Sequence, residues 1–278
     1  MSSIPDPTEL PTIAFIGGGN MARSLIGGLV ARGADPARIR VAEPVPALRE
    51  ALAADFGVQA FAEASAAVQG AGLWLLAVKP QVMRAACAPL AATAAAASPL
   101  VVSIAAGITV DRLREWLGGD AAVVRCMPNT PALLGAGVTG LYAGPGVDAR
   151  RRAQAEAVLA AAGATVWIGE ETLMDAVTAV SGSGPAYVFL LAEAMQAAAR
   201  GEGLDPEQAR TLVVHTLLGA ARMLAETGEP ADELRRRVTS PGGTTQAAIE
   251  RFQADGFEAL VARAIHAARV RGAELAGG

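Results

Sequence analysis

The chain has few of the residues that would support several common classes of function. Among its 278 residues are only two cysteines, Cys87 and Cys126, and two histidines, His215 and His266. Two cysteines cannot form a disulfide framework, and neither residue type has metal-ligand spacing, so we expect no structural metal. No apolar run approaches the ~18 residues that a membrane span needs. Residues 1–12 have neither the basic region nor the apolar stretch of a secretion signal, which predicts a cytoplasmic protein without membrane partners.

Charge and composition exclude further classes. The formal net charge is -4, which argues against general binding of nucleic acid. The chain is 52% hydrophobic and 18% charged, enough for a packed core. Lysine is nearly absent: of the 23 lysines and arginines, Lys79 is the one lysine. A lysine kept in so arginine-rich a chain indicates a position where arginine would not serve.

The order of expected strands and helices predicts an α/β chain with two domains. Short apolar strands are expected at 12–17, 39–44, 58–62, 72–78, 99–106, 121–129, 139–144 and 164–169. Helices between them predict a Rossmann-like parallel sheet with helices on both faces. No strand is expected after residue 172, and helices follow at 174–201, 205–228, 231–238, 244–256 and 257–276. We therefore expect a sheet domain over 1–169 and an all-helical domain over 170–278.

The sequence GGGNMA at residues 17–22 predicts a dinucleotide site. It matches G-x-G-x-x-A, directly follows an expected strand and opens an expected helix. Glycine lets the backbone approach a pyrophosphate, and the helix start favours its charge. We expect Gly17, Gly19, Asn20 and Met21 to bind the cofactor. The alternative is a tight turn with no ligand.

The end of the second expected strand bears on the choice of cofactor. Glu43 stands there, where an acid normally accepts from the adenosine ribose hydroxyls and disfavours a 2'-phosphate. Residues 44–46 contain no arginine, and the nearest one is Arg49. These residues alone favour NAD slightly over NADP. The alternative is that Glu43 points to solvent.

Two further strand ends are expected at the same edge of the sheet. Ala77, Lys79 and Pro80 end a buried strand, and Lys79 there could contact a cofactor phosphate or ribose. Asn129 ends another strand and offers neutral hydrogen bonds near a nicotinamide. The alternatives are a solvated lysine and a rigid turn that satisfies its own backbone.

Five segments together resemble the pyrroline-5-carboxylate reductase family. In order, they are GGGNMA at 17–22, AVKP at 77–80, CMPNTPALL at 126–134, DAVTAVSGSGPAY at 175–187 and TSPGGTT at 239–245. The last two are specific to the family, and the resemblance runs from Ile13 to about residue 275. It implies that the chain reduces 1-pyrroline-5-carboxylate to L-proline by hydride transfer from NADPH or NADH, the last step of proline biosynthesis.

The resemblance also implies an organisation and a site. A dinucleotide-binding domain precedes a substrate-binding helical domain that interlocks with a second subunit, and such dimers often assemble into a decamer. By position in TSPGGTT, Thr245 is implied as the catalytic residue on the ring nitrogen, and Ser240, Gly243 and Thr244 as the carboxylate cradle. The family most often prefers NADPH. Glu43 departs from the neutral or basic residues often found at its position, which leaves the preference open.

Imine chemistry explains why this turn has hydroxyls and no cation. Reduction needs a hydride on carbon and a proton on nitrogen, and an iminium accepts hydride readily, so the enzyme mainly has to position the substrate. Free N–H groups at a helix start suit the carboxylate. The Thr245 hydroxyl can accept from the iminium N–H and later donate to the amine. The alternative is a capping turn, with Thr244 or Thr245 as the N-cap and nothing bound.

The segment SGSGPAY at 181–187 has glycines early in an expected helix. Gly182 and Gly184 would each cost about 1 kcal/mol relative to alanine there. That cost predicts a close backbone approach to a cofactor or a partner helix. Ordinary packing is the alternative.

Other functions remain open from the residues alone. A hydroxyacid dehydrogenase of related build would use a lysine in its helical domain, and no lysine follows Lys79. A pyridoxal-phosphate protein would need a Schiff-base lysine, for which Lys79 is a poor candidate. A sensor that binds the cofactor without turnover is the non-enzymatic alternative.

Overall fold

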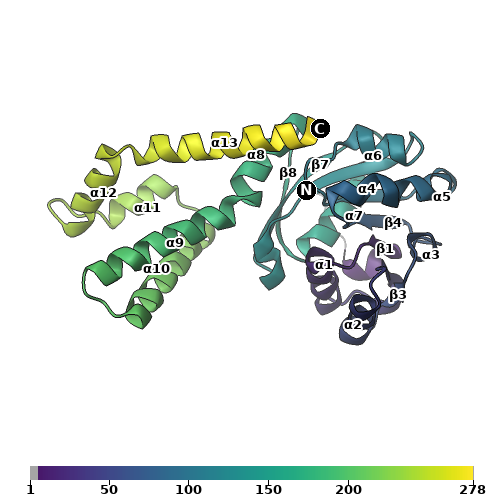
Figure 1. Cartoon of the computed structure of the whole chain (residues 1–278), viewed down its shortest axis with the longest axis horizontal. Helices are drawn as coiled ribbons and strands as arrows, with labels where there is room; N and C mark the ends of the chain where they lie inside the picture. The colour runs from purple at the N-terminus through teal and green to yellow at the C-terminus, as the bar shows by residue number, and fades with distance from the viewer. Residues whose placement is uncertain (1–5, 278) are drawn as a thin grey trace. The chain divides into compact units, whose positions relative to one another are not determined.

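In this computed structural model of the protein, residues 6–277 are described (Figure 1). They form two compact units. Unit 1 runs to Ser183 and resumes at Ala268, and unit 2 is Gly184–Ala267. The compact units thus divide later than the domain boundary at 169/170 that the sequence leads us to expect. No helix among the described residues is long and apolar enough to cross a membrane.

Unit 1 is built on an eight-stranded sheet with the order β3-β2-β1-β4-β5-β6-β7-β8. Its strands are β1 (Ile13–Ile16), β2 (Ile39–Ala42), β3 (Gln59–Phe61), β4 (Leu73–Leu76), β5 (Leu100–Ser103), β6 (Ala122–Met127), β7 (Gly137–Ala143) and β8 (Gly163–Trp167). The Rossmann-like prediction is confirmed, but parallel pairing fails at one junction. β6 and β7 are antiparallel, with Cys126 opposite Leu141. Residues 128–136 are too few for a parallel crossover, which needs about a dozen.

Helices cover both faces of this sheet, because successive strand residues point to opposite sides. Phe15 packs with Leu25 and Leu52 in one core, and Ile16 packs with Met83 and Leu113 in the other. The first face carries α1 (Asn20–Ala31), α2 (Pro46–Phe56) and α7 (Ala149–Ala160). The second carries α3 (Ala64–Ala67), α4 (Pro80–Cys87), α5 (Ala91–Ala97) and α6 (Val110–Trp116). Short turns η1 (Pro7–Glu9), η2 (Pro36–Arg38), η3 (Ala88–Leu90), η4 (Thr130–Leu134) and η5 (Glu171–Leu173) complete the unit.

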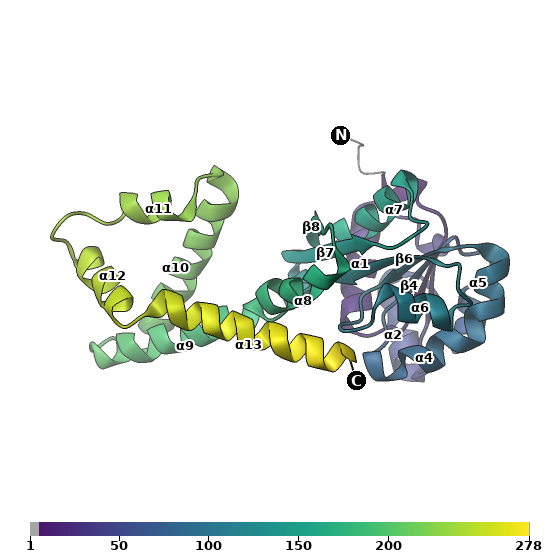
Figure 2. The same cartoon turned by 90° about the horizontal axis from the view of Figure 1, so that it is seen from above.

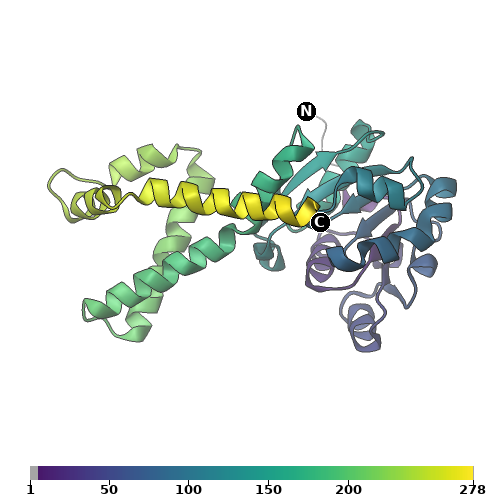
Figure 3. The ribbon, with the colours of Figure 1, turned by 45° about the horizontal axis from the view of Figure 1, so that its top comes forward.

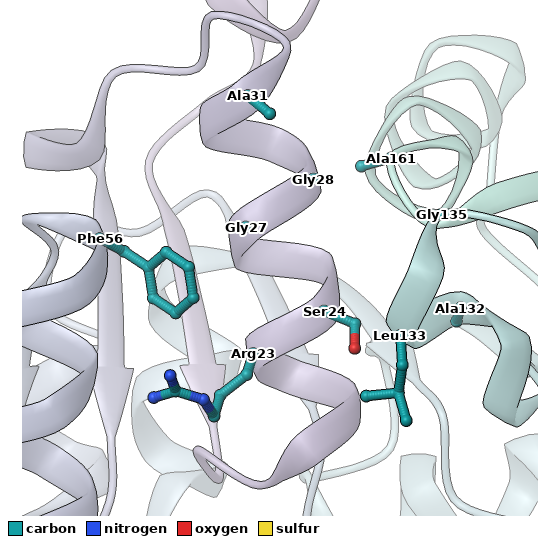
Figure 4. Close-up of a pocket in the computed structure, with 10 residues that line it drawn as sticks. All are labelled: Arg23, Ser24, Gly27, Gly28, Ala31, Phe56, Ala132, Leu133, Gly135 and Ala161. Carbon is teal, nitrogen blue, oxygen red and sulfur yellow. The ribbon is translucent and has the colours of Figure 1, made fainter.

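On the first face, α1 lies very close to the end of α7. A Cβ on Gly28 would stand 2.1 Å from the Ala161 carbonyl oxygen. Figure 4 shows Gly28 on α1 beside Ala161, along a groove of about 420 Å³. Small residues on α1 therefore fix this helix against the chain that follows α7.

Unit 2 is entirely helical (Figure 2). It contains α9 (Gly184–Gly201), α10 (Pro206–Thr227), α11 (Ala231–Arg237), α12 (Thr244–Ala254) and most of α13 (Phe257–Gly277), which Figure 3 shows as one continuous helix. Asp205 caps α10 by accepting from the N–H groups of Glu207 and Gln208, and Gly228 ends it with a φ of 69°. These ends are the ones that the sequence predicts.

Unit 2 has almost no core of its own. Its buried side chains among the described residues are Ala209, Val213 and Leu234. Large apolar side chains are instead exposed: Val188, Phe189, Leu190, Leu191, Leu204, Leu212, Val214, Leu218, Met223, Leu224, Val238, Phe252, Phe257, Leu260 and Val261. So much exposed apolar surface marks an interface.

We expect the chain to be at least a dimer at micromolar concentration, because one copy leaves the apolar faces of unit 2 in water. Sedimentation velocity over a dilution series measures this. Leu190, 66% exposed, should weaken association when changed to Glu, because the interface would then bury a carboxylate. Leu48→Glu, at an exposed position in unit 1, is the matched control and should associate like the wild type. A stable, active monomer would contradict the expectation.

Candidate active site

The ends of five strands define the candidate cofactor edge of unit 1. β2, β1, β4, β5 and β6 are parallel neighbours, so their carboxyl ends share one edge. From β1 the chain continues to β2 on one side, while β4 lies on the other, and ligands bind at such a reversal of strand order. Gly17 follows β1 with a φ of 103°, and a Cβ there would lie 2.8 Å from the Ala77 carbonyl oxygen after β4. Only glycine allows this approach.

The glycine loop leaves the start of α1 open. Gly19 is the N-cap of α1, and no side chain caps the helix there. A Cβ on Gly19 would meet nothing within 4 Å, and Gly19 and Asn20 are exposed. The first N–H groups of a helix have no acceptor within it. The residues expected to bind pyrophosphate, from Gly17 to Met21, therefore fit an anionic group at this place.

Glu43 is buried, so the solvent-facing alternative is wrong. It follows β2 and is 7% exposed. Its Oε2 accepts from the Gly18 N–H at 3.0 Å, and its Oε1 accepts from the Val45 N–H at 2.9 Å. The carboxylate therefore fastens the glycine loop to the end of β2. Each oxygen keeps a second lone pair, so the ribose contact stays a prediction.

Lys79 and Pro80 lie where the sequence predicts, after β4. Lys79 is the N-cap of α4 and Pro80 is its first residue. The Lys79 side chain is exposed and has no hydrogen-bond or ion-pair partner within residues 6–277. It is therefore free to contact a phosphate, and this role also stays a prediction.

Asn129, at the end of β6, is held by its own chain. Its side chain is buried, and its Nδ2 donates to the Ser181 carbonyl oxygen at 3.1 Å. Its Oδ1 accepts from the Val138 N–H at 2.9 Å. These bonds give Asn129 a structural role in joining β6, β7 and the turn at Thr178–Gly182, called the Ser181 turn below. A contact with the nicotinamide stays a prediction.

The Ser181 turn interrupts the helix expected at 174–201. α8 (Met174–Val177) is followed by a π-helical turn at Thr178–Gly182, and α9 begins only at Gly184. A Cβ on Gly182 would lie 2.5 Å from the Met127 Cε, whereas one on Gly184 would meet nothing within 4 Å. A side chain at position 182 would therefore require the end of the flexible Met127 side chain to move. π-turns of this kind are frequent at functional sites.

A buried arginine that the sequence reading passed over fastens this segment to the sheet. Arg125 on β6 pairs with Glu171 at 3.1 Å and with Asp175 at 3.6 Å. Glu171 also accepts from the Val110 N–H at the start of α6, at 2.8 Å. These contacts explain why residues 170–183 belong to unit 1. The available signal was a charged residue inside the apolar strand AVVRCM.

The end of β5 is a second region that the sequence reading did not assign. Ser103 is fully buried, and its hydroxyl accepts from the Ala105 N–H at 3.4 Å. Residues 104–107 follow at the cofactor edge. The signal was the run of small residues AAG at 105–107, just after the strand.

Within unit 2, the TSPGGTT turn has an open helix start. Gly243 is the N-cap of α12, with no side-chain cap, so the alternative of a turn capped by Thr244 or Thr245 is wrong. Gly242 has a φ of 71°, and its N–H donates to the Gln246 Oε1 at 2.6 Å. The backbone and Gln246 therefore make the hydrogen bonds of the turn, and the hydroxyls of Thr244 and Thr245 are not needed for them.

The hydroxyls of this turn are unpaired. Within the described part of the chain, the Ser240, Thr244 and Thr245 hydroxyls have no hydrogen-bond partner. Ser240 and Thr244 are exposed, and Thr245 is half-buried. The described residues also contain no group of three His, Cys, Asp or Glu side chains able to hold a metal. The turn thus offers hydroxyls and helix N–H groups, which suit a small carboxylate.

Two family models match separate parts of the chain, and sequence relatives match nearly all of it. A model described as pyrroline-5-carboxylate reductase dimerisation matches residues 171–275, and one described as NADP oxidoreductase, coenzyme F420-dependent, matches 12–107. A pyrroline-5-carboxylate reductase of Pseudomonas aeruginosa is 54% identical over 267 residues, covering 96% of this chain and 97% of the relative. That of Haemophilus influenzae is 44% identical over 264 residues, covering 95% and 97%.

Solved structures show the same fold. A pyrroline-5-carboxylate reductase from Coxiella burnetii superposes with a TM-score of 0.94 at 40% identity, covering 96% of this chain and 99% of its own. A Plasmodium falciparum pyrroline carboxylate reductase with NADP bound superposes with a TM-score of 0.82 at 25% identity. It covers 96% of this chain and 98% of its own.

We expect Asn129→Asp to destabilise unit 1 by roughly 1–3 kcal/mol, because a carboxylate would replace the amide donor facing the Ser181 carbonyl oxygen. Denaturant unfolding measures the free energy. Asn20→Asp, at the exposed start of α1, is the matched control and should be at least as stable as the wild type, because a helix start favours a negative charge. Equal stability of the two variants would remove Asn129 from this structural role.

Proposed function

The chain belongs to the pyrroline-5-carboxylate reductase family, and we propose that the turn at residues 239–245 holds the imine for reduction. The enzyme is NAD(P)H-dependent and reduces 1-pyrroline-5-carboxylate to L-proline, the last step of proline biosynthesis. The hydroxyacid dehydrogenase and the sensor are not favoured.

The observation that carries the proposal is the uncapped start of α12. Gly243 supplies no side chain to the first-turn N–H groups, which lack acceptors within the helix. The exposed hydroxyls of Ser240 and Thr244 add donors beside them. A substrate carboxylate accepts from these groups, and the helix dipole favours its charge. No cationic side chain belongs to the turn, so no positive charge opposes an iminium there.

Thr245 is the residue that we assign to the substrate nitrogen. Its half-buried hydroxyl has no partner within the described residues, so it can accept from the iminium N–H. As the nitrogen becomes an amine, the same hydroxyl can donate to it. Gln246 stabilises the turn. Its Oε1 accepts from the Gly242 N–H, and its Nε2 donates to the Glu250 Oε1 at 2.7 Å.

The cofactor edge of unit 1 fits the dinucleotide. A bound reduced nicotinamide supplies the hydride for the imine carbon. We assign the open N–H groups at Gly19–Met21 to the pyrophosphate, Glu43 to the adenosine ribose, and Lys79 to a phosphate or ribose. Asn129 keeps the end of β6 and the Ser181 turn in place next to them.

Assembly and location complete the proposal. The chain self-associates through its dimerisation region, which the family model matches over 171–275. We also propose that five such dimers assemble into a decamer. A cytoplasmic location is supported by Cys87 and Cys126, both free, as in reducing compartments.

Thr245→Ala should lower kcat/KM for the imine about tenfold to a hundredfold, since a hydrogen bond to a charged group contributes roughly 1.5–3 kcal/mol. Thr245→Ser should keep much of the activity because it keeps the hydroxyl. Steady-state kinetics and cofactor titration measure both effects, and cofactor affinity should barely change.

The matched control is Thr172→Ala, at an exposed threonine of unit 1, which should behave like the wild type. If Thr245→Ala is fully active, Thr245 has no role in the chemistry. If cofactor affinity collapses instead, the turn belongs to the dinucleotide site.

A further inference from the structure

The end of β2 holds a cation that has no role in the function described so far. Arg49 lies near the start of α2 and is half-buried. Its Nη1 donates to the carbonyl oxygens of Glu43 at 2.9 Å and Pro44 at 3.3 Å. Its Nε and Nη2 have no hydrogen-bond partner within residues 6–277. One edge of the guanidinium is therefore anchored, and its other donors are free.

The neighbouring acid does not neutralise this cation. The Glu43 carboxylate is turned inward and accepts from the Gly18 and Val45 N–H groups. Arg49 contacts the Glu43 main chain, and no ion pair joins the two side chains in the described structure. The positive charge therefore lies at the end of β2, while the negative charge is buried and hydrogen-bonded.

Other arginines of this region are committed elsewhere. Arg23 on α1 pairs with Asp55, and its guanidinium lies 5.1 Å from the centre of the Phe56 ring. Arg40 on β2 donates to the Gln69 carbonyl oxygen and lies over the Phe61 ring. Arg49 is the arginine whose guanidinium is fixed on the carbonyls that follow β2.

The end of the second strand is where a dinucleotide fold meets the adenosine ribose, and a nearby arginine there can accommodate a 2'-phosphate. Arginine presents donors in a planar fork that matches phosphate oxygens. The start of α2 adds free N–H groups, because Val45 caps it without a side-chain bond.

We propose that Arg49 is the residue that allows this enzyme to bind NADPH. Its free Nε and Nη2 donors pair with the 2'-phosphate, which offsets the repulsion from Glu43. NADH lacks that phosphate, so Arg49 contributes little to its binding and the enzyme accepts both cofactors. The assignment rests on the proposed function, which places the dinucleotide on the glycine loop.

Binding of 2',5'-ADP and 5'-AMP to the full-length chain tests this without turnover. Isothermal titration calorimetry should show that Arg49→Gln weakens 2',5'-ADP about tenfold to a hundredfold, as expected for a charge-assisted hydrogen bond, and leaves 5'-AMP unchanged. Arg49→Lys should lose less affinity for 2',5'-ADP than Arg49→Gln, because lysine keeps the positive charge. Arg38→Gln, at an exposed arginine before β2, is the matched control and should bind both like the wild type.

Kinetics give the second measurement. In Arg49→Gln the KM for NADPH should rise by a similar factor while kcat and all constants for NADH stay constant. An equal loss for both nucleotides would show a structural role and overturn the assignment, as would no loss for either. A wild type that turns over with neither cofactor would overturn the proposed function as well.

Glu43→Gln tests the opposing charge. It removes the negative charge but keeps an oxygen acceptor for only one of the Gly18 and Val45 N–H groups, so both nucleotides can lose affinity while the affinity for 2',5'-ADP relative to 5'-AMP should rise. Glu43→Ser should also shift preference toward NADPH, but it loses the bond to Gly18 and should weaken both nucleotides. An unchanged ratio in both variants would contradict the assignment of the two charges.

Discussion

The bond from the Gly18 amide to the buried Glu43 carboxylate is the interaction on which the cofactor end of the sheet depends. It holds the glycine loop from the β2 side, while the contact of Gly17 with the Ala77 carbonyl holds it from the β4 side. With the loop fixed on both sides, α1 begins with uncapped N–H groups beside open space at Gly19. These N–H groups are therefore held in position by the fold, which would lower the entropic cost of binding the pyrophosphate that we assign to them.

Unit 2 differs from unit 1, because few of its apolar side chains are buried within one copy of the chain. With only Ala209, Val213 and Leu234 buried among its described residues, its helices cannot be packed to protein density alone. The turn at 239–245, to which we assign the substrate and which we call the substrate turn, belongs to this unit. We therefore expect substrate binding to depend on association, because the helices that carry this turn have almost no core of their own in one copy.

The sequence predicts the features that depend on local patterns. Apolar runs bounded by glycine and proline located the strands, and Asp205 located the start of α10. Features that depend on distant residues could not be predicted. Whether Glu43 faced solvent or the loop depended on Gly18 lying beside it, and the π-helical turn at 178–182 contacts Met127, a residue distant in sequence. In the substrate turn, the residues were identified by resemblance, while the use of Gly243 as the N-cap required coordinates.

A crystal structure of the assembled enzyme with NADP⁺ and L-proline tests the central claim most directly. The account predicts the proline carboxylate on the N–H groups and hydroxyls at the start of α12, and the proline nitrogen within about 3.2 Å of the Thr245 Oγ1. A carboxylate bound to an arginine, or a nitrogen bound to any group other than Thr245, would contradict it.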